Sequence, residues 1–118
     1  MFFDGAAGQE GAGAAVVFVS SQRQILLYSF LLSELWSINV AEYQALIIGL
    51  QMAIEMGTSQ LEIFGDSKLI INQILEQYDV KKEYLIPYWK YAKKLLANFE
   101  AITLEHIPRK ENRQADAF

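Results

Sequence analysis

Acidic side chains are the residues of this chain with the greatest capacity for chemistry. The sequence of 118 residues has no cysteine and one histidine, His106, which argues against a thiolate site and against a zinc centre built on several histidines. Carboxylate oxygens remain, and they are the ligands that hard cations such as magnesium and manganese prefer. The candidates for such a site are Asp4, Glu42, Asp66 and Asp116.

Each of these acids also has an ordinary structural interpretation. Asp4 precedes a glycine, as in many turns, and Glu42 stands three residues after Asn39, which is the spacing of a helix capping box. Asp66 lies where an N-cap would begin the next helix, and Asp116 would favour the dipole of a terminal helix. A metal site therefore requires a fold that brings several of these acids together.

Alternating apolar residues and turn signals predict five strands. A short first strand ends at Asp4 and Gly5, and the glycine-rich stretch behind it is expected to form a turn-rich connection. Because this stretch leads into a strand rather than a helix, a phosphate-binding loop is disfavoured. The other predicted strands cover residues 14–20, 24–32, 61–64 and 101–107.

Helical periodicity predicts the remaining elements. Residues 39–56 carry apolar side chains at helical spacing, with Leu46 and Leu50 on one side, and Gly57 is a typical helix stop. A second helix follows Asp66, a third is expected over residues 82–99, and a last one begins near residue 112. The helix between the third and fourth strands requires a right-handed crossover, which places the fourth strand parallel to and beside the first.

The predicted fold class is α/β, a mixed five-stranded sheet in the order 3-2-1-4-5 within one domain over residues 1–118. Strands 1–3 are antiparallel, strands 4 and 5 run parallel to strand 1, and helices flank the sheet. This arrangement lets Asp4, Glu42, Asp66 and Asp116 share one site. Because like charges repel, such a cluster implies divalent cations, and two magnesium ions about 4 Å apart are the usual device for phosphoryl displacement.

Charge is distributed unevenly along the chain. The net charge is −4, yet residues 1–66 hold one basic and seven acidic residues, whereas residues 67–118 hold nine basic and seven acidic ones. The second part could face a polyanion, or its lysines could form an ordinary solvated helix face. No apolar run approaches the roughly 18 residues of a membrane span, and the start of the sequence lacks the pattern of a secretory signal.

Five segments, in order along the chain, carry a family resemblance. They are FFDGAA (2–7), NVAEYQALIIGL (39–50), FGDSKLIINQI (64–74), YLIPYWKYAKKLLANFE (84–100) and HIPRKENRQADAF (106–118). Together they resemble type 1 ribonuclease H, and most of all the ribonuclease H domain of reverse-transcriptase polyproteins from gypsy-like retrotransposons of plants. The resemblance implies a ribonuclease H-like fold over nearly the whole chain.

The resemblance also implies an activity and a catalytic set. The activity is hydrolysis of the RNA strand of RNA/DNA hybrids by a two-metal-ion mechanism, with Mg²⁺ as the metal and Mn²⁺ as a substitute. A histidine or an arginine near the last acid assists the reaction in this family, and His106 and Arg109 both stand at matching positions. The residues that match metal ligands are Asp4, Glu42, Asp66 and Asp116.

Substrate contacts follow from the same resemblance. Asn39 matches a position that touches the minor groove, and Ser37 nearby is expected to contact a phosphate. Gln9 or its neighbour Glu10 stands where relatives place an amide against the substrate. Lys68 replaces a frequent glutamine and, because its ammonium group cannot accept a hydrogen bond, should turn toward phosphate.

Two departures from the family pattern affect the expected activity. The chain has no extra basic helix after Gln77, so we expect weak, salt-sensitive affinity for the hybrid and dependence on a neighbouring reverse-transcriptase polymerase domain. The C-terminal helix is truncated at Phe118, which would leave Asp116 weakly held. The alternative function is a catalytically weak or inactive remnant that binds nucleic acid or protein. The expected location is the cytoplasm or a replication particle, without secretion or membrane attachment.

Overall fold

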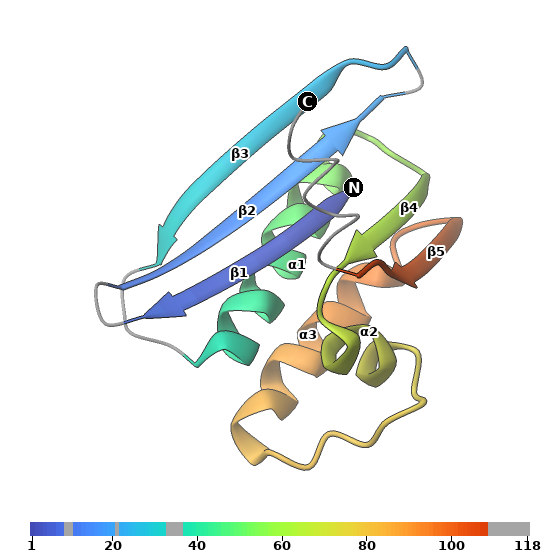
Figure 1. Cartoon of the computed structure of the whole chain (residues 1–118). Coiled ribbons are helices and arrows are strands. Elements are labelled where there is room, and N and C mark those ends of the chain that lie inside the picture. The colour runs from blue at the N-terminus through green and yellow to red at the C-terminus, as the bar shows by residue number, and fades with distance from the viewer. Residues whose placement is uncertain (9–10, 21, 33–36, 109–118) are drawn as a thin grey trace.

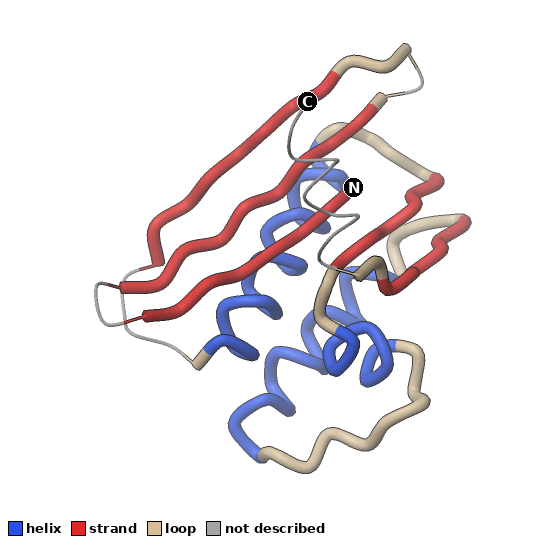
Figure 2. Tube along the Cα trace, viewed as in Figure 1, coloured by secondary structure: helices blue, strands red, loops and turns tan. Residues whose placement is uncertain are grey.

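The computed structural model describes residues 1–8, 11–20, 22–32 and 37–108, which form one sheet with helices packed on it (Figure 1). The strands are β1 (Phe2–Gly8), β2 (Gly11–Val19), β3 (Ile25–Leu32), β4 (Gln60–Gly65) and β5 (Ala101–His106). The helices are α1 (Ile38–Glu55), α2 (Lys68–Ile74), the short 3₁₀ helix η1 (Glu83–Leu85) and α3 (Ile86–Leu96). Figure 2 shows these helices on one side of the sheet.

The strand order is β3-β2-β1-β4-β5, as predicted. Strands β1 to β3 form an antiparallel meander, and β4 lies parallel to both β1 and β5. The 18 residues of α1 make the crossover from the meander to β4. The central position of β1 follows from this crossover, because the chain returns to the open side of β1 rather than to the edge at β3.

The first two strands are longer than the sequence predicted. β1 continues past Asp4 and Gly5 to Gly8, and β2 already begins at Gly11, so the expected turn at Asp4–Gly5 was wrong. Antiparallel pairing extends through small residues, including Ala6 opposite Gly13. Glycine and alanine have low strand propensity, but the ladder of hydrogen bonds outweighs that preference here.

Two helix boundaries also differ from prediction. Helix α1 starts after Ser37, whose hydroxyl accepts a hydrogen bond from the backbone N–H of Val40 at 3.3 Å, so the capping box at Asn39 was wrong. The expected third helix is divided into η1 and α3, and it ends at Leu96 rather than near residue 99. Pro87 lies in the first turn of α3, where its missing N–H costs no helical hydrogen bond.

The core lies between α1 and the sheet. Leu46 and Leu50 of α1 are fully buried, as their spacing predicted. Ala53 is buried with them, and Phe3 and Val16 meet this group from the strands. At the C-terminal end of α1, Gly57 adopts the left-handed φ of +75° that glycine accepts most readily. None of the helices in the described ranges is both long and apolar enough to cross a bilayer.

Candidate active site

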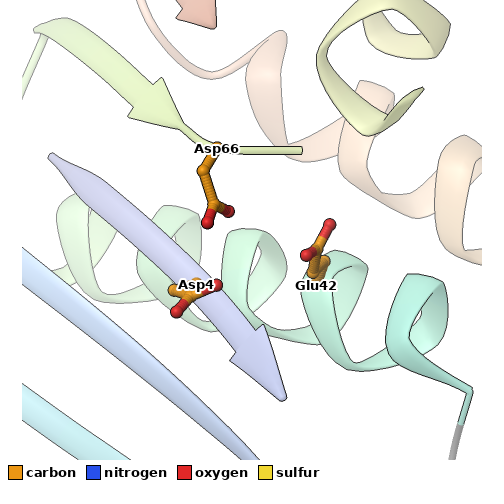
Figure 3. A group of neighbouring side chains, drawn as sticks. All are labelled: Asp4, Glu42 and Asp66. Atoms are coloured by element: carbon orange, nitrogen blue, oxygen red, sulfur yellow. The ribbon is translucent and has the colours of Figure 1, made fainter. Parts of the chain in front are cut away.

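Three carboxylates from separate elements meet at one point of the fold (Figure 3). Asp4 lies in β1, Glu42 in the second turn of α1, and Asp66 directly after β4. Each side chain offers an oxygen atom, and these three atoms all lie within 4.8 Å of one another. Glu42 is 6% exposed, while Asp4 and Asp66 are half-buried, so the group faces solvent on one side.

Strand register places Asp4 beside Asp66. The parallel ladder pairs Phe2 with Phe64 and Phe3 with Gly65. Asp4 directly follows Phe3, and Asp66 directly follows Gly65. Because β1 and β4 run in the same direction, the residues that follow these two pairs also lie side by side, which brings the two carboxylates to one place. The sequence predicted this proximity from topology alone.

Gly5 brings the helix that carries Glu42 against β1. A Cβ atom on Gly5 would lie 2.3 Å from the carbonyl carbon of Ala41 and 2.4 Å from the backbone nitrogen of Glu42. Backbone atoms cannot yield to such an overlap, so only glycine allows this approach. Sequence reasoning assigned Gly5 to a turn and missed this role. A glycine within an otherwise continuous strand was the signal that could have revealed it.

A serine, rather than Asp66, caps the helix that follows β4. The hydroxyl of Ser67 accepts a hydrogen bond from the backbone N–H of Ile70 at 3.3 Å, which satisfies a donor at the start of α2. The interpretation of Asp66 as an N-cap was therefore wrong. With the cap supplied next to it, the Asp66 carboxylate lies with Asp4 and Glu42.

His106 approaches the same site from β5. Its Nε2 atom lies 3.2 Å from the backbone carbonyl oxygen of Asp66, which accepts a hydrogen bond when that nitrogen is protonated. The ring is exposed, at the last residue of the edge strand β5. This contact joins residues far apart in sequence and had no signal in the local pattern.

The other predicted site residues are distributed around this point. Ser37 caps α1, Asn39 is half-buried in its first turn, and Lys68 is the exposed first residue of α2. The predicted positions of Gln9, Arg109 and Asp116, and of the terminal helix, lie outside the described residues.

Buried polar contacts hold the three helices behind the site together. The Tyr43 hydroxyl donates a hydrogen bond to the Gln73 side-chain carbonyl at 2.7 Å. The indole N–H of Trp89 donates to the backbone carbonyl of Gln73 at 3.0 Å. Burial raises the pKa of Tyr43, so the phenol keeps its proton. Since Tyr43 directly follows Glu42, the network fixes α1 next to the acidic group.

The donor set suits a hard divalent cation. All three groups are carboxylates, and oxygen ligands favour magnesium, manganese or calcium over zinc. Three negative charges in so small a volume repel one another, and a bound cation relieves that repulsion. The residues present therefore fit a divalent metal.

The sheet order and the acidic group define a ribonuclease H fold, and comparison with known proteins supports this class. Residues 2–118 match the family described as reverse transcriptase-like. The chain is 34% identical to ribonuclease HI of Halobacterium salinarum over 118 residues, which is 98% of this chain. The crystal structure of ribonuclease H1 from that archaeon superposes with a TM-score of 0.89 at 32% identity, covering 98% of this chain and 89% of the other. The chain thus belongs to the reverse transcriptase-like family and has the fold of type 1 ribonuclease H.

Two further structures extend the comparison. The N-terminal ribonuclease H domain of a Mycobacterium tuberculosis protein has a TM-score of 0.87 at 30% identity, covering 98% of this chain and 85% of the other. LC11 ribonuclease H1 in complex with an RNA/DNA hybrid has a TM-score of 0.85 at 29% identity, covering 98% and 89%. The chain spans 30% of the length of the whole mycobacterial protein and 59% of the halobacterial enzyme.

Proposed function

We propose that this protein is a divalent-metal-dependent endonuclease that hydrolyses the RNA strand of RNA/DNA hybrids. The observation that carries the proposal is the convergence of Asp4, Glu42 and Asp66 within 4.8 Å on a ribonuclease H fold. The hybrid as substrate is supported by LC11 ribonuclease H1, a relative whose structure contains one. The match to the reverse transcriptase-like family supports the proposal that a polymerase domain is the neighbour of this domain. The sequence resemblance supports the proposal that it originates from a gypsy-like retrotransposon.

The carboxylates would act as a rigid cradle. Asp4 lies in β1, Asp66 directly follows the adjacent strand β4, and Glu42 is fixed by the contact of its helix with Gly5, so the three oxygen atoms would be positioned before substrate arrives. Bound divalent cations supply activation of the attacking water and stabilisation of the leaving oxygen. We assign this cradle to Mg²⁺, with Mn²⁺ as a substitute and Asp116 as a fourth ligand.

Substrate would lie across the N-terminal ends of α1 and α2. Ser37 accepts the hydrogen bond of the helix cap, which leaves its hydroxyl proton able to donate to a phosphate oxygen. Asn39, one turn before Glu42, would read the minor groove, where the 2′-hydroxyl distinguishes RNA from DNA. Lys68, which lies two residues after Asp66 and is exposed, would contact a phosphate group of the hybrid. We also assign Gln9 to substrate contact, through its side-chain amide.

An auxiliary role is assigned to His106 or Arg109. The His106 Nε2 atom lies 3.2 Å from the backbone carbonyl oxygen of Asp66, and from there the ring would exchange a proton with substrate or product. Alanine substitution of each residue distinguishes them, because only the auxiliary residue should lower kcat while substrate affinity is kept.

The proposal is tested by cleavage of a hybrid labelled on its RNA strand, with MgCl₂ present. We expect the wild-type chain to cut this RNA and to leave duplex DNA intact, and Asp66→Asn to abolish cutting. Asp79→Asn is the matched control, since it makes the same change at an exposed residue outside the site. Equal cleavage by Asp66→Asn and the wild type would disprove the proposal. Binding of the hybrid without cleavage would favour the alternative, a nucleic-acid-binding module.

A further inference from the structure

Strand β3 is an unusual edge strand. It forms one border of the sheet, and among the described residues no strand pairs with its outer side. Its eight residues, ILLYSFLL, include no charged side chain and no proline. The opposite border, β5, is shorter and carries Glu105 and His106. Natural sheets usually protect a long apolar edge with charges, proline or a bulge, so β3 lacks the protection that β5 has.

The backbone of β3 presents a regular row of outward hydrogen-bonding groups. The N–H of Ser20 donates to the carbonyl of Gln24 at 2.9 Å, which fixes Gln24 as a residue that bonds toward β2. Antiparallel ladders alternate, so the residues two, four, six and eight positions later, Leu26, Tyr28, Phe30 and Leu32, also bond toward β2. The residues between them, Leu27, Ser29 and Leu31, therefore direct their N–H and C=O groups outward.

The side chains of the same residues are exposed on the face away from α1. Leu27 is 65% exposed and Leu31 is 96% exposed. Tyr28 and Phe30 point the other way, toward the core. The segment Leu26–Leu32 reads leucine, leucine, aromatic, serine, aromatic, leucine, leucine, so its pattern is the same in both directions about Ser29.

We propose that two copies of this protein associate by antiparallel pairing of their β3 strands about a two-fold axis at Ser29. A second copy is favoured over another partner because this pattern is self-complementary in the antiparallel direction. Ser29 then faces Ser29 of the partner subunit, and both residues direct their backbone groups outward, as a hydrogen-bonded pair requires. Leu27 faces Leu31 of the partner subunit, and the two-fold axis repeats that pair.

The pairing places side chains of the same kind opposite one another on both faces of the joined sheet. The two most exposed leucines of β3 cover one another on the outer face. On the core side, Tyr28 lies opposite Phe30 of the partner subunit, a cross-strand aromatic pair of the kind that stabilises sheets. Strand β2 separates β3 from β1, so the interface does not include β1, which carries Asp4, or β4, which directly precedes Asp66.

The first test is sedimentation velocity of the full chain over a range of concentrations. We expect a concentration-dependent change from 13.4 kDa to twice that mass. Leu31→Lys should weaken the dimer by about tenfold or more, because a lysine on the edge opposes strand pairing. Leu75→Lys, at a leucine directly after α2 that is 46% exposed, should leave the dimer unchanged. A monomer at every soluble concentration, or equal weakening by both variants, would overturn the proposal.

The second test determines which residues of the two β3 strands face one another. It remains valid even if Leu31→Lys fails to fold. Two residues facing one another in a hydrogen-bonded pair have Cα atoms about 5.5 Å apart, within the range of a disulfide. The chain has no cysteine, so Ser29→Cys should give a disulfide-linked dimer under mild oxidation. Thr103→Cys, at an exposed residue of the other edge strand, is the matched control and should link much more slowly. Equal rates for the two variants would refute pairing at Ser29.

Discussion

The backbone nitrogen of Glu42 lies so close to Gly5 that a methyl group on the glycine would come within 2.4 Å of it. This contact sets the depth at which α1 sits on β1. Asp4 directly precedes Gly5 in β1, so the same contact also sets the position of Glu42 relative to Asp4.

Gly5→Ala is expected to separate α1 from β1. The overlap is with backbone atoms, so relief requires movement of the helix, and overpacking of this kind costs about 1–3 kcal/mol of the free energy of unfolding. We expect a lower midpoint in urea and a greater loss of cleavage than the stability change alone explains. Gly13→Ala is the control, since its Cβ would lie 3.4 Å from the Phe30 carbonyl oxygen, an ordinary contact. Similar activity of the two variants would contradict the role given to Gly5.

Divalent cations are expected to stabilise the fold through the three carboxylates. A ligand that binds the native state alone, at a hundred times its Kd, adds about 2.7 kcal/mol. Thermal unfolding should therefore shift upward with MgCl₂ or MnCl₂ and return after chelation. Asp66→Asn should lose most of the shift, whereas Asp79→Asn should keep it. An identical shift in both variants would mean that the cations act elsewhere.

Tyr43→Phe is expected to destabilise the protein from within. The Gln73 side-chain carbonyl would lose its buried donor, and an unsatisfied buried group costs about 1–3 kcal/mol. Tyr91→Phe is the control, because the Tyr91 hydroxyl accepts a hydrogen bond from the Gln51 side chain and this bond is exposed to solvent. Equilibrium unfolding in urea measures both, and an equal effect of the two variants would argue against the buried network.

Ser67→Ala is expected to loosen the start of α2 beside Asp66. Loss of an N-cap typically costs about 1 kcal/mol, and here the frayed residues adjoin a carboxylate of the site. We expect reduced cleavage together with reduced stability, and recovery of both in Ser67→Asp, since aspartate is also a good cap. Ser37→Ala tests the corresponding cap of α1. If Ser67→Asp is as impaired as Ser67→Ala, hydrogen bonding at the cap is not the cause.

The order of elements could be predicted from sequence because it depends on local patterns and on one general rule. Helical spacing identified α1, and the handedness of crossovers then placed β4 beside β1. That step alone brought Asp4 and Asp66 together. The chemistry of the site could be anticipated from residue types alone. A site made of carboxylates, in a chain without cysteine, suits only a few hard metal ions.

The features that escaped prediction depend on contacts between distant residues. A glycine inside a strand can indicate a close approach, but the residues near Gly5 do not show that the approaching backbone is that of Ala41. The contact of His106 with the Asp66 carbonyl likewise exists only after β5 has paired with β4. Helix caps were misplaced for a different reason. Asn39 and Ser37 are both good caps by residue type, so the local sequence does not distinguish them, and the structure has Ser37 as the cap.

The parallel pairing of Phe3 with Gly65 also has a consequence for synthesis. Strands β1, β2 and β3 are neighbours in the chain and can pair as soon as they leave the ribosome, whereas β4 must follow the whole of α1. Distant pairings form late because a long loop has to close first. Growing chains should therefore remain unable to capture a cation at Asp4 until translation has passed Asp66.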